Sequence, residues 1–243
     1  MADECIHGFE AGLCDICYPR TAPEPPKAPR ASTSARKPAV RAPGAPAVAP
    51  YSLATQRLFH VTHLRNLEAI LHDGELRADA TPVVDVSSAT TRELRRAADL
   101  ADGSTVAEHV AFYASPVAAR WIELRDGAIG PHWSDAARAA KATEFVQLAI
   151  PAVTLGDHIL AADADAGAPA TRFARGAVDA TQLLRRQPDF LAAEILAPHA
   201  VPFSDVALIG VANEPVRDQV RALLSGTGFR PKVAVYPPWF VPE

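Results

Sequence analysis

The chain has 243 residues, of which 49% are hydrophobic and 21% are charged, and its formal net charge is −4. This length suffices for one sizeable core with a small appendage, and the negative balance excludes a protein that coats nucleic acid through overall basic charge. No apolar run approaches the ~18 residues of a transmembrane helix, and the first residues lack the apolar centre of a secretory signal. We therefore expect a cytoplasmic protein without membrane contact.

The first 18 residues contain all three cysteines of the chain. With one histidine they form the pattern C-x-H-x6-C-x2-C, and the four side chains are Cys5, His7, Cys14 and Cys17. Thiolate and imidazole ligands at such short spacing suit a tetrahedral structural Zn²⁺, which would supply the folding energy that so short a segment lacks. The alternative is a redox Cys-x-x-Cys pair, which the sequence context favours less.

Residues 19–50 are predicted to form a disordered linker. They contain nine of the 22 prolines, six lysines or arginines and one acidic residue. Such a stretch cannot bury enough apolar surface to offset the entropy of ordering. Its positive charge can serve solubility or supply weak attraction to phosphates. The remaining residues, 51–243, carry 18 basic and 23 acidic residues and are predicted to form the folded domain.

The segment Leu58–Leu76 organises the rest of the domain. Its start has the apolar pattern of a strand, interrupted by His60, Thr62 and His63. Apolar residues at helical spacing follow, and Gly74 stands where a helix C-cap would. We therefore predict a strand, a short amphipathic helix and a turn. The polar residues indicate either a solvated strand end or the edge of a ligand site.

A second helix is predicted soon after an extended stretch at residues 82–86, with Thr90 or Thr91 as its N-cap. Its first two turns contain Arg92, Arg95 and Arg96. Basic residues are unfavourable at the positive end of the helix dipole. The arginines therefore face either solvent or a bound anion.

The later elements follow from local patterns. We predict helices at residues 117–125, after Ser134, near 179–190 and at 214–228, and strands at 106–116, 145–150, 191–196, 206–211 and 232–236. Residues 153–176 are expected to be rich in loops. Inside the strand at 191–196, Glu194 stands alone among apolar neighbours. A carboxylate there is costly unless it is paired or reaches solvent, so Glu194 is either a functional group or a strand-edge residue.

The motifs that are missing narrow the function. The sequence has no phosphate-binding glycine loop, no HExxH and no GxSxG, and residues 51–243 contain no cysteine. A P-loop NTPase, a typical zinc protease and a thiol enzyme are therefore excluded by motif.

Three blocks of the domain together resemble one known family. They are HVTHLRNLEAIL (60–71), GSTVAEHVAFYASP (103–116) and AAEILAPHAVPFSDV (192–206). In order and spacing they are similar to the DarT family of NAD-dependent ADP-ribosyltransferases, which modify bases in single-stranded DNA within toxin–antitoxin systems. The resemblance implies an α+β fold, namely an ADP-ribosyltransferase-like split, curved β core with peripheral helices and an NAD cleft between two small sheets.

The resemblance also implies roles for individual residues. Glu194 would be the catalytic glutamate, which stabilises the positively charged ribose formed when nicotinamide departs. Arg92 would be the arginine that assists at the target base, with Arg95 and Arg96 as alternatives. The implied NAD-binding positions are His60, Val61, Thr62, Asn66 and Arg77. NAD is thus expected as a substrate, single-stranded DNA as a partner, and a macrodomain-type antitoxin as a further partner.

Some positions depart from the family pattern. The family block F-Y-F-x-P-R-S becomes FYASPVA, so that Val117 replaces an arginine, and residues 129–138 have no recognisable family counterpart. The alternatives are therefore the same fold acting on RNA or protein, NAD-dependent RNA 2′-phosphotransfer, or an inactive binding module. The lone Glu194 argues against phosphotransfer, and the intact His60, Thr62 and Glu194 argue against an inactive module.

Overall fold

The structure of the protein is a computed structural model that describes residues 51–78, 80–187 and 190–241. These residues belong to one compact unit, Ala49–Glu243. The four predicted zinc ligands and the predicted linker lie outside the described residues. Among the described residues, no helix combines the length and apolar character needed to cross a bilayer.

Helices and strands alternate irregularly along the unit, which confirms the predicted α+β class. The helices are α1 (Leu67–Asp73), α2 (Ala89–Ala97), α3 (Ala119–Arg125), α4 (Asp135–Ala139), α5 (Ala177–Arg185) and α6 (Glu214–Ser225). The strands are β1 (Arg57–His63), β2 (Glu75–Arg77), β3 (His109–Tyr113), β4 (Phe145–Pro151), β5 (Leu160–Ala162), β6 (Phe173–Arg175), β7 (Glu194–Pro198), β8 (Ala200–Pro202), β9 (Leu208–Val211) and β10 (Lys232–Val235).

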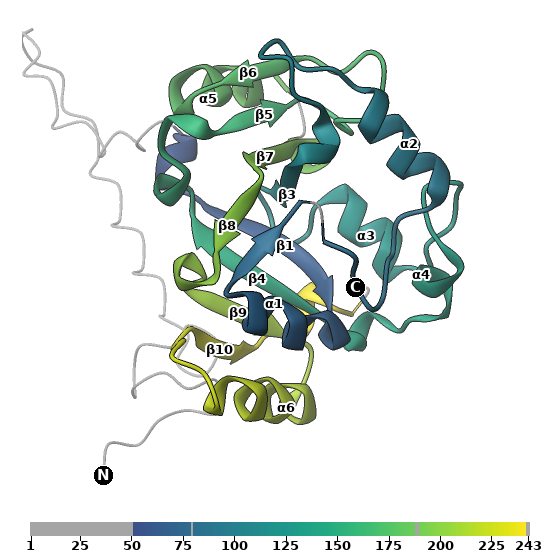
Figure 1. Ribbon diagram of the computed structural model, residues 1–243, viewed down its shortest axis with the longest axis vertical. Coiled ribbons are helices and arrows are strands. Elements are labelled where there is room, and N and C mark those ends of the chain that lie inside the picture. Colours follow the sequence, from purple (N-terminus) through teal and green to yellow (C-terminus); the bar gives the residue numbers. More distant parts are fainter. Residues whose placement is uncertain (1–50, 79, 188–189, 242–243) are drawn as a thin grey trace, which may run out of the picture. The chain divides into compact units, whose positions relative to one another are not determined.

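Eight strands form one mixed sheet in the order β10-β9-β4-β1-β3-β7-β5-β6, and β2 pairs with β8 in a small second sheet. The large sheet is nearly divided in its middle. Strand β1 pairs with β4 along its whole length but meets β3 at a single position, Phe59 opposite Tyr113. The residues of β1 after Phe59 are therefore not paired with β3. Figure 1 shows α2, α3 and α4 on one side of these strands, with α5 beside β5 and β6 and α6 beside β10.

The organising segment folds as predicted. Strand β1 leads through one 3-10 turn into α1, and Gly74 ends that helix with φ of 74°, where its N–H donates to the carbonyl of Ile70. A left-handed residue at this position is what glycine tolerates without strain. Leu67 and Leu71 are the buried positions of α1, so its apolar face packs on the core and fixes the exit of β1.

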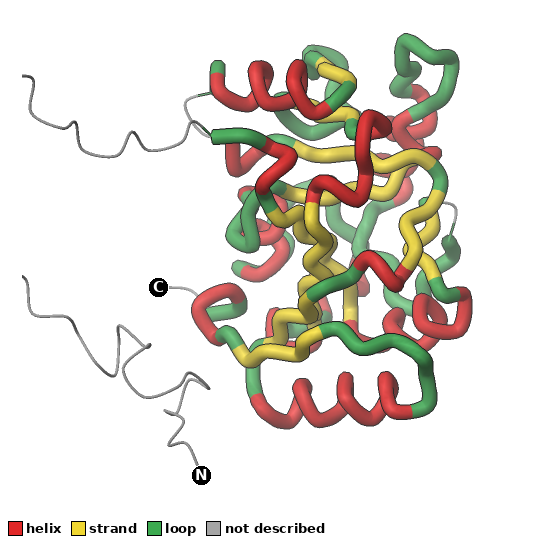
Figure 2. The backbone as a smooth tube through the Cα atoms, turned by 90° about the vertical axis from the view of Figure 1, so that its left-hand side faces the viewer, coloured by secondary structure: helices red, strands yellow, loops and turns green. Residues whose placement is uncertain are grey.

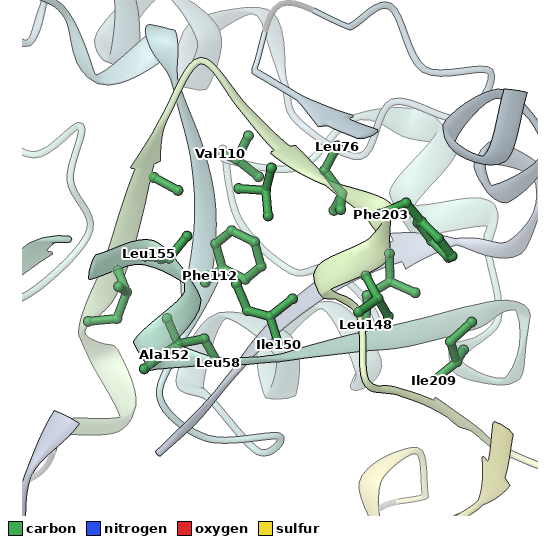
Figure 3. Packing of buried hydrophobic residues seen from close by; sticks show 14 of the residues in the cluster. Leu58, Leu76, Val110, Phe112, Leu148, Ile150, Ala152, Leu155, Phe203 and Ile209 are labelled. Atoms are coloured by element: carbon green, nitrogen blue, oxygen red, sulfur yellow. The ribbon is translucent and has the colours of Figure 1, made fainter. Parts of the chain in front are cut away.

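The main core lies between the large sheet and the elements that cover it. Its members come from β1, β3, β4, β7 and β9 and from helices α1, α5 and α6. Figure 3 shows Leu58, Phe112, Leu148 and Ile150 packed against one another. Each such side chain contributes about 1.5–3 kcal/mol when buried. In Figure 2 the strands run through the middle of the unit and helices close both ends. This packing makes the strands a rigid base for the side chains that they carry.

A second, aromatic cluster supports helix α3. Trp121, Phe145 and Phe240 are each 1% exposed, and their rings meet edge to face at 5.5 and 5.6 Å. The Trp121 indole N–H donates to the carbonyl of Trp239 at 2.6 Å. The C-terminal residues thereby anchor the side of the domain where α3 and α4 lie.

Several predicted boundaries were wrong. Helix α2 is capped by Ser88, not by Thr90 or Thr91, because its hydroxyl accepts the N–H of Thr91 at 3.1 Å. Residues 190–192 form a 3-10 turn, so Glu194 is the first residue of strand β7 and not an interior one. Residues 153–176, predicted to be rich in loops, also contain the three-residue strands β5 and β6. Strands this short show too little alternation to be detected locally.

Candidate functional site

A cleft of about 1820 Å³ opens along the line where β1 and β3 separate. Its lining includes residues of β1, α1, β2, α2, β3 and α3 and the first residue of β7, together with the loops before α2 and α4. Sites for single small ligands usually measure roughly 300–1,000 Å³. The cleft therefore has room for a dinucleotide and part of a second substrate.

One wall of the cleft is built around Glu194. Its side chain is 3% exposed, and its Oε2 accepts a hydrogen bond from Nη1 of Arg95 at 2.8 Å. Arg95 projects from helix α2 and is 17% exposed. Burial by itself would lower the pKa of Arg95, but the Glu194 carboxylate outweighs that effect and the pKa is raised. Arg95 therefore stays protonated and balances the buried carboxylate.

The sequence had left open which arginine acts at the site. Arg92, the first choice, is directed to Asp85 and to the carbonyl of Ser87, the latter at 3.0 Å. Arg96 is exposed and forms no ion pair within the described part of the chain, although it lines the cleft. Arg95 is the one that meets Glu194. Spacing could not separate three arginines that lie within five residues of one helix.

Tyr113 is a site residue that the sequence analysis missed. It lies opposite Glu194 in the register of β3 and β7, and its side chain lines the cleft. Burial and then the neighbouring Glu194 charge raise its pKa, so the phenol stays protonated. The signal was the alternation along β3, where Val110 and Phe112 face the core. That alternation turns Ala111 and Tyr113 to the other face.

Arg120 is a second site residue that was missed. Its guanidinium lies over the ring of Trp133 at 5.2 Å from the centroid, and it pairs with Asp165. Arg120 and Trp133 both line the cleft. Arg120 therefore adds a second cation to the cleft wall that contains Arg95 and Glu194. Nothing in the local sequence distinguishes Arg120 from the other helical arginines.

A second wall of the cleft begins with His60 on β1. Its Nδ1 lies 2.9 Å from the carbonyl oxygen of Ala111. Since a carbonyl only accepts, Nδ1 carries the proton and Nε2 is the acceptor of the neutral ring. Burial lowers the pKa of His60, and the bond to Ala111 offsets this only in part. His60 therefore presents a neutral ring with one fixed tautomer.

Thr62 lies two residues further along β1 and also lines the cleft. Its Oγ1 accepts a hydrogen bond from Nδ2 of Asn66 at 3.2 Å. Asn66 in turn exchanges two hydrogen bonds with the backbone of Val84, at 2.8 and 2.9 Å. The hydroxyl hydrogen of Thr62 has no partner among the described residues, whereas both N–H donors of Asn66 are used within the protein.

The two remaining predicted NAD-binding residues also line the cleft. Val61 packs against the aromatic cluster that contains Trp121. Arg77, on β2, pairs with Glu75 at 3.3 Å. The cleft thus brings together Glu194, His60, Val61, Thr62, Asn66, Arg77 and Arg92. Their individual roles remain predictions.

Metal binding was predicted only for Cys5, His7, Cys14 and Cys17, which lie outside the described residues. Within residues 51–78, 80–187 and 190–241, no group of three or more His, Cys, Asp or Glu side chains is arranged to hold a metal ion.

Comparison with known proteins identifies the family. The sequence profile of the family described as "ssDNA thymidine ADP-ribosyltransferase, DarT" matches residues 59–241. A Mycobacterium tuberculosis protein named DNA ADP-ribosyl transferase is 31% identical over 209 residues, covering 74% of this chain and 86% of that protein.

Solved structures of DarT from Thermus sp. 2.9 share the fold. The complex with ADP-ribosylated ssDNA is 22% identical, has a TM-score of 0.66, and aligns over 77% of this chain and 97% of that one. The complex with NAD⁺ is 21% identical, with a TM-score of 0.62 over 77% and 98% of the two chains. The family resemblance seen in the sequence is thus confirmed, and the chain belongs to the DarT family of ssDNA thymidine ADP-ribosyltransferases.

Proposed function

We propose that this protein transfers ADP-ribose from NAD to a thymidine base in single-stranded DNA, with Glu194 and Arg95 at the catalytic centre. The observation that carries the proposal is the buried ion pair of these two residues, 2.8 Å apart, on the wall of a cleft whose other wall presents His60 and Thr62. A desolvated charge pair in a cleft is a frequent sign of a functional site. The family match supports both the donor and the acceptor.

The β1 wall fits the nicotinamide end of NAD. His60 offers an acceptor at Nε2 and Thr62 offers a hydroxyl donor, and residues two apart on a strand share one face. The carboxamide of nicotinamide and the adjoining ribose hydroxyls present both donors and acceptors. We infer that His60 and Thr62 bind this end of NAD, while Val61 and Arg77 contact it from neighbouring positions.

The role of Glu194 follows from the charge that develops during transfer. NAD supplies an ADP-ribosyl group whose bond to nicotinamide breaks as positive charge grows on the ribose. The Glu194 carboxylate stabilises that charge and accepts a hydrogen bond from a ribose hydroxyl. Arg95 holds this carboxylate in place at 2.8 Å. Preorganised groups of this kind contribute roughly 10²–10³ to kcat.

The proton of the acceptor must also be placed. Thymine in DNA carries one ring N–H, so a new bond from that nitrogen to the ribose carbon releases one proton as the bond to nicotinamide breaks. Arg95 has a raised pKa and remains a cation, which makes it a hydrogen-bond donor that orients the base. Glu194 lies beside it and is the group that takes the proton.

The test is incubation with NAD labelled in the adenosine part and defined oligonucleotides. A single-stranded oligonucleotide containing thymidine should become labelled and release one nicotinamide per label. The same oligonucleotide without thymidine should not. Glu194→Gln should lower the rate at least ~100-fold. Glu93→Gln is the matched control, because Glu93 is exposed on α2 and does not line the cleft.

Other labelled products decide the alternatives. Label on RNA or protein but not on DNA would contradict the proposed acceptor while keeping NAD as the donor. Release of nicotinamide by neither wild type nor Glu93→Gln would contradict the enzyme itself and favour a binding module. Active protein should also harm cells that express it unless an antitoxin, predicted to be a macrodomain, removes the modification. Healthy growth with active protein would oppose that prediction.

We also propose, from the sequence alone, one structural zinc at Cys5, His7, Cys14 and Cys17. Metal analysis of the gently purified full chain should give one zinc per chain, and Cys14→Ser should remove it. Less than one zinc in the wild type would refute this site. ADP-ribosyl transfer does not depend on the zinc in the mechanism above, so the two proposals fail independently.

A further inference from the structure

Residues 84–88 form a short segment, here called the strap, that runs along the cleft directly into helix α2. We propose that Asn66 and Arg92 are positioning residues that hold the strap on the two sides of the cleft and so set the position of α2 and of Arg95. This role differs from direct contact with NAD or the acceptor base, which the family resemblance implied for these two residues. The inference rests on the proposed function.

The first attachment is the Asn66 side chain. Because the N–H of Val84 can only donate, the atom facing it at 2.8 Å is the amide oxygen Oδ1. Nδ2 then directs its two hydrogens to the carbonyl of Val84 at 2.9 Å and to Oγ1 of Thr62 at 3.2 Å. Asn66 is 6% exposed, so its donors have no further capacity for a ligand. The Asn66 amide thus pairs with both backbone groups of Val84, as a neighbouring strand would. Because it donates to Oγ1 of Thr62, the Thr62 hydroxyl is left to act as a donor.

The second attachment is the pair of Asp85 and Arg92. Asp85 accepts the N–H of Ser87 at 2.9 Å and pairs with Arg92, whose guanidinium also donates to the carbonyl of Ser87 at 3.0 Å. Arg92 therefore folds back onto the segment that precedes its own helix. It closes the turn from the strap into α2 and pairs with Asp85, whereas Glu194 pairs with Arg95.

The strap is also bonded to the loop before α4. Ser134 donates from its hydroxyl to the carbonyl of Asp85 at 2.6 Å and from its N–H to the carbonyl of Val86 at 3.0 Å. The N–H of Ser88 donates to the carbonyl of His132 at 2.8 Å. The strap thus bridges the β1 wall and the α4 side. Its last residue, Ser88, caps α2, which places Arg95 two turns later against Glu194.

The test is a double-mutant comparison of Asp85→Ala, Arg92→Ala and the double variant. Transfer to a thymidine oligonucleotide gives kcat and KM for NAD. Each single variant should lower kcat/KM roughly 10- to 100-fold, the effect of misplacing a catalytic group by about 1 Å. The double variant should be within about twofold of the less active single variant, because both changes break the shared Asp85–Arg92 pair. If the loss of kcat/KM in the double variant equals the product of the two single losses, Arg92 acts independently of Asp85 and the proposal is overturned.

Conservative variants separate positioning from contact. Arg92→Lys should regain most of the activity, since an ammonium can still pair with Asp85, whereas a guanidinium that contacts substrate is not replaceable by lysine. Asn66→Asp keeps the acceptor for Val84 N–H but loses both donors, and should be as impaired as Asn66→Ala. Normal KM and kcat in Asn66→Asp would overturn the role of Asn66. Arg217→Ala on α6, where Arg217 pairs with Glu214 and Asp218, is the matched control and should match wild type.

Failure of the proposed function would be recognised separately. If wild type and Arg217→Ala transfer no label, the proposed function is wrong, but the strap is still measured by amide hydrogen exchange. Residues 89–97 should then exchange faster in Asp85→Ala and Arg92→Ala than in wild type and Arg217→Ala. Unchanged exchange in α2 would overturn the strap, whatever the activity.

Discussion

The two walls of the cleft differ in how they are built. The β1 wall presents His60 and Thr62, which are two residues apart and belong to one strand. The α2–β7 wall presents Arg95 and Glu194, which are 99 residues apart and meet only in the folded chain. The first wall is a product of local sequence, whereas the second depends on the whole topology. The pair proposed to bind the donor can therefore be seen in a short motif, but the Arg95–Glu194 pair cannot.

The walls also differ in charge. Burial lowers the pKa of His60, so that the β1 wall stays neutral. Arg95 has a raised pKa because the Glu194 charge outweighs its burial, so the other wall stays charged. A neutral wall of fixed donors and acceptors suits the uncharged carboxamide and ribose groups. A charged wall suits the step in which positive charge develops. Substitutions in each wall should therefore have different effects on stability and transfer.

The largest effect is expected when the Arg95–Glu194 ion pair of the charged wall is removed. Arg95→Met leaves Glu194 buried without its cation, and such a loss costs up to about 3–5 kcal/mol of folding free energy. Transfer should fall at least ~100-fold, because the base loses its donor as well. Chemical denaturation and single-turnover transfer measure the two effects.

The double variant Arg95→Met with Glu194→Gln gives the control. Removing both charges should recover most of the stability, since no isolated carboxylate remains buried. It should recover none of the activity. Equal stability of Arg95→Met and wild type would contradict the buried ion pair, and activity in the double variant would contradict the catalytic role.

These differences explain what the sequence could predict. The strand, helix and glycine turn of Leu58–Leu76 depend on near neighbours, and they were predicted correctly. The lone Glu194 was also noticed, but its place at the strand start was not, because Leu191 and its neighbours look strand-like while forming a 3-10 turn. The rotation of α2, which selects Arg95, is set by Ser88 and the distant residues 132–134. Local spacing contains no information on such contacts.

A smaller effect is expected when acid protonates His60 on the neutral β1 wall. The ordinary pKa of histidine is about 6.5 in the unfolded chain, and that of folded His60 is lower. As pH falls below about 6.5, the unfolded chain binds a proton that folded His60 resists. Stability should therefore fall by up to about 1.4 kcal/mol per pH unit until the folded pKa is reached. Protonation also converts Nε2 from an acceptor to a donor, so KM for NAD should rise in acid.

The matched variants are His60→Gln and His72→Gln. His60→Gln should flatten the acid dependence of both stability and KM, although not completely, since His63 and His109 also have lowered pKa values owing to burial. His72 has a side chain that is 88% exposed, and its replacement should leave both profiles unchanged. A His60→Gln profile as steep as wild type would show that the β1 wall does not titrate through His60.

The smallest effect concerns two helix caps, one on the helix of the charged wall and one on a helix outside the cleft. Ser88 caps α2 and Asn213 caps α6, and each accepts a backbone N–H at 3.1 Å. Replacing either by alanine should cost about 1 kcal/mol of stability. Only Ser88→Ala should also lower transfer several-fold at temperatures well below unfolding, because α2 presents Arg95 to Glu194 while α6 lies outside the cleft lining. If the two variants lose equal stability but only Ser88→Ala loses activity, transfer depends on the position of α2. If the two variants are equally active, transfer does not depend on the cap of α2.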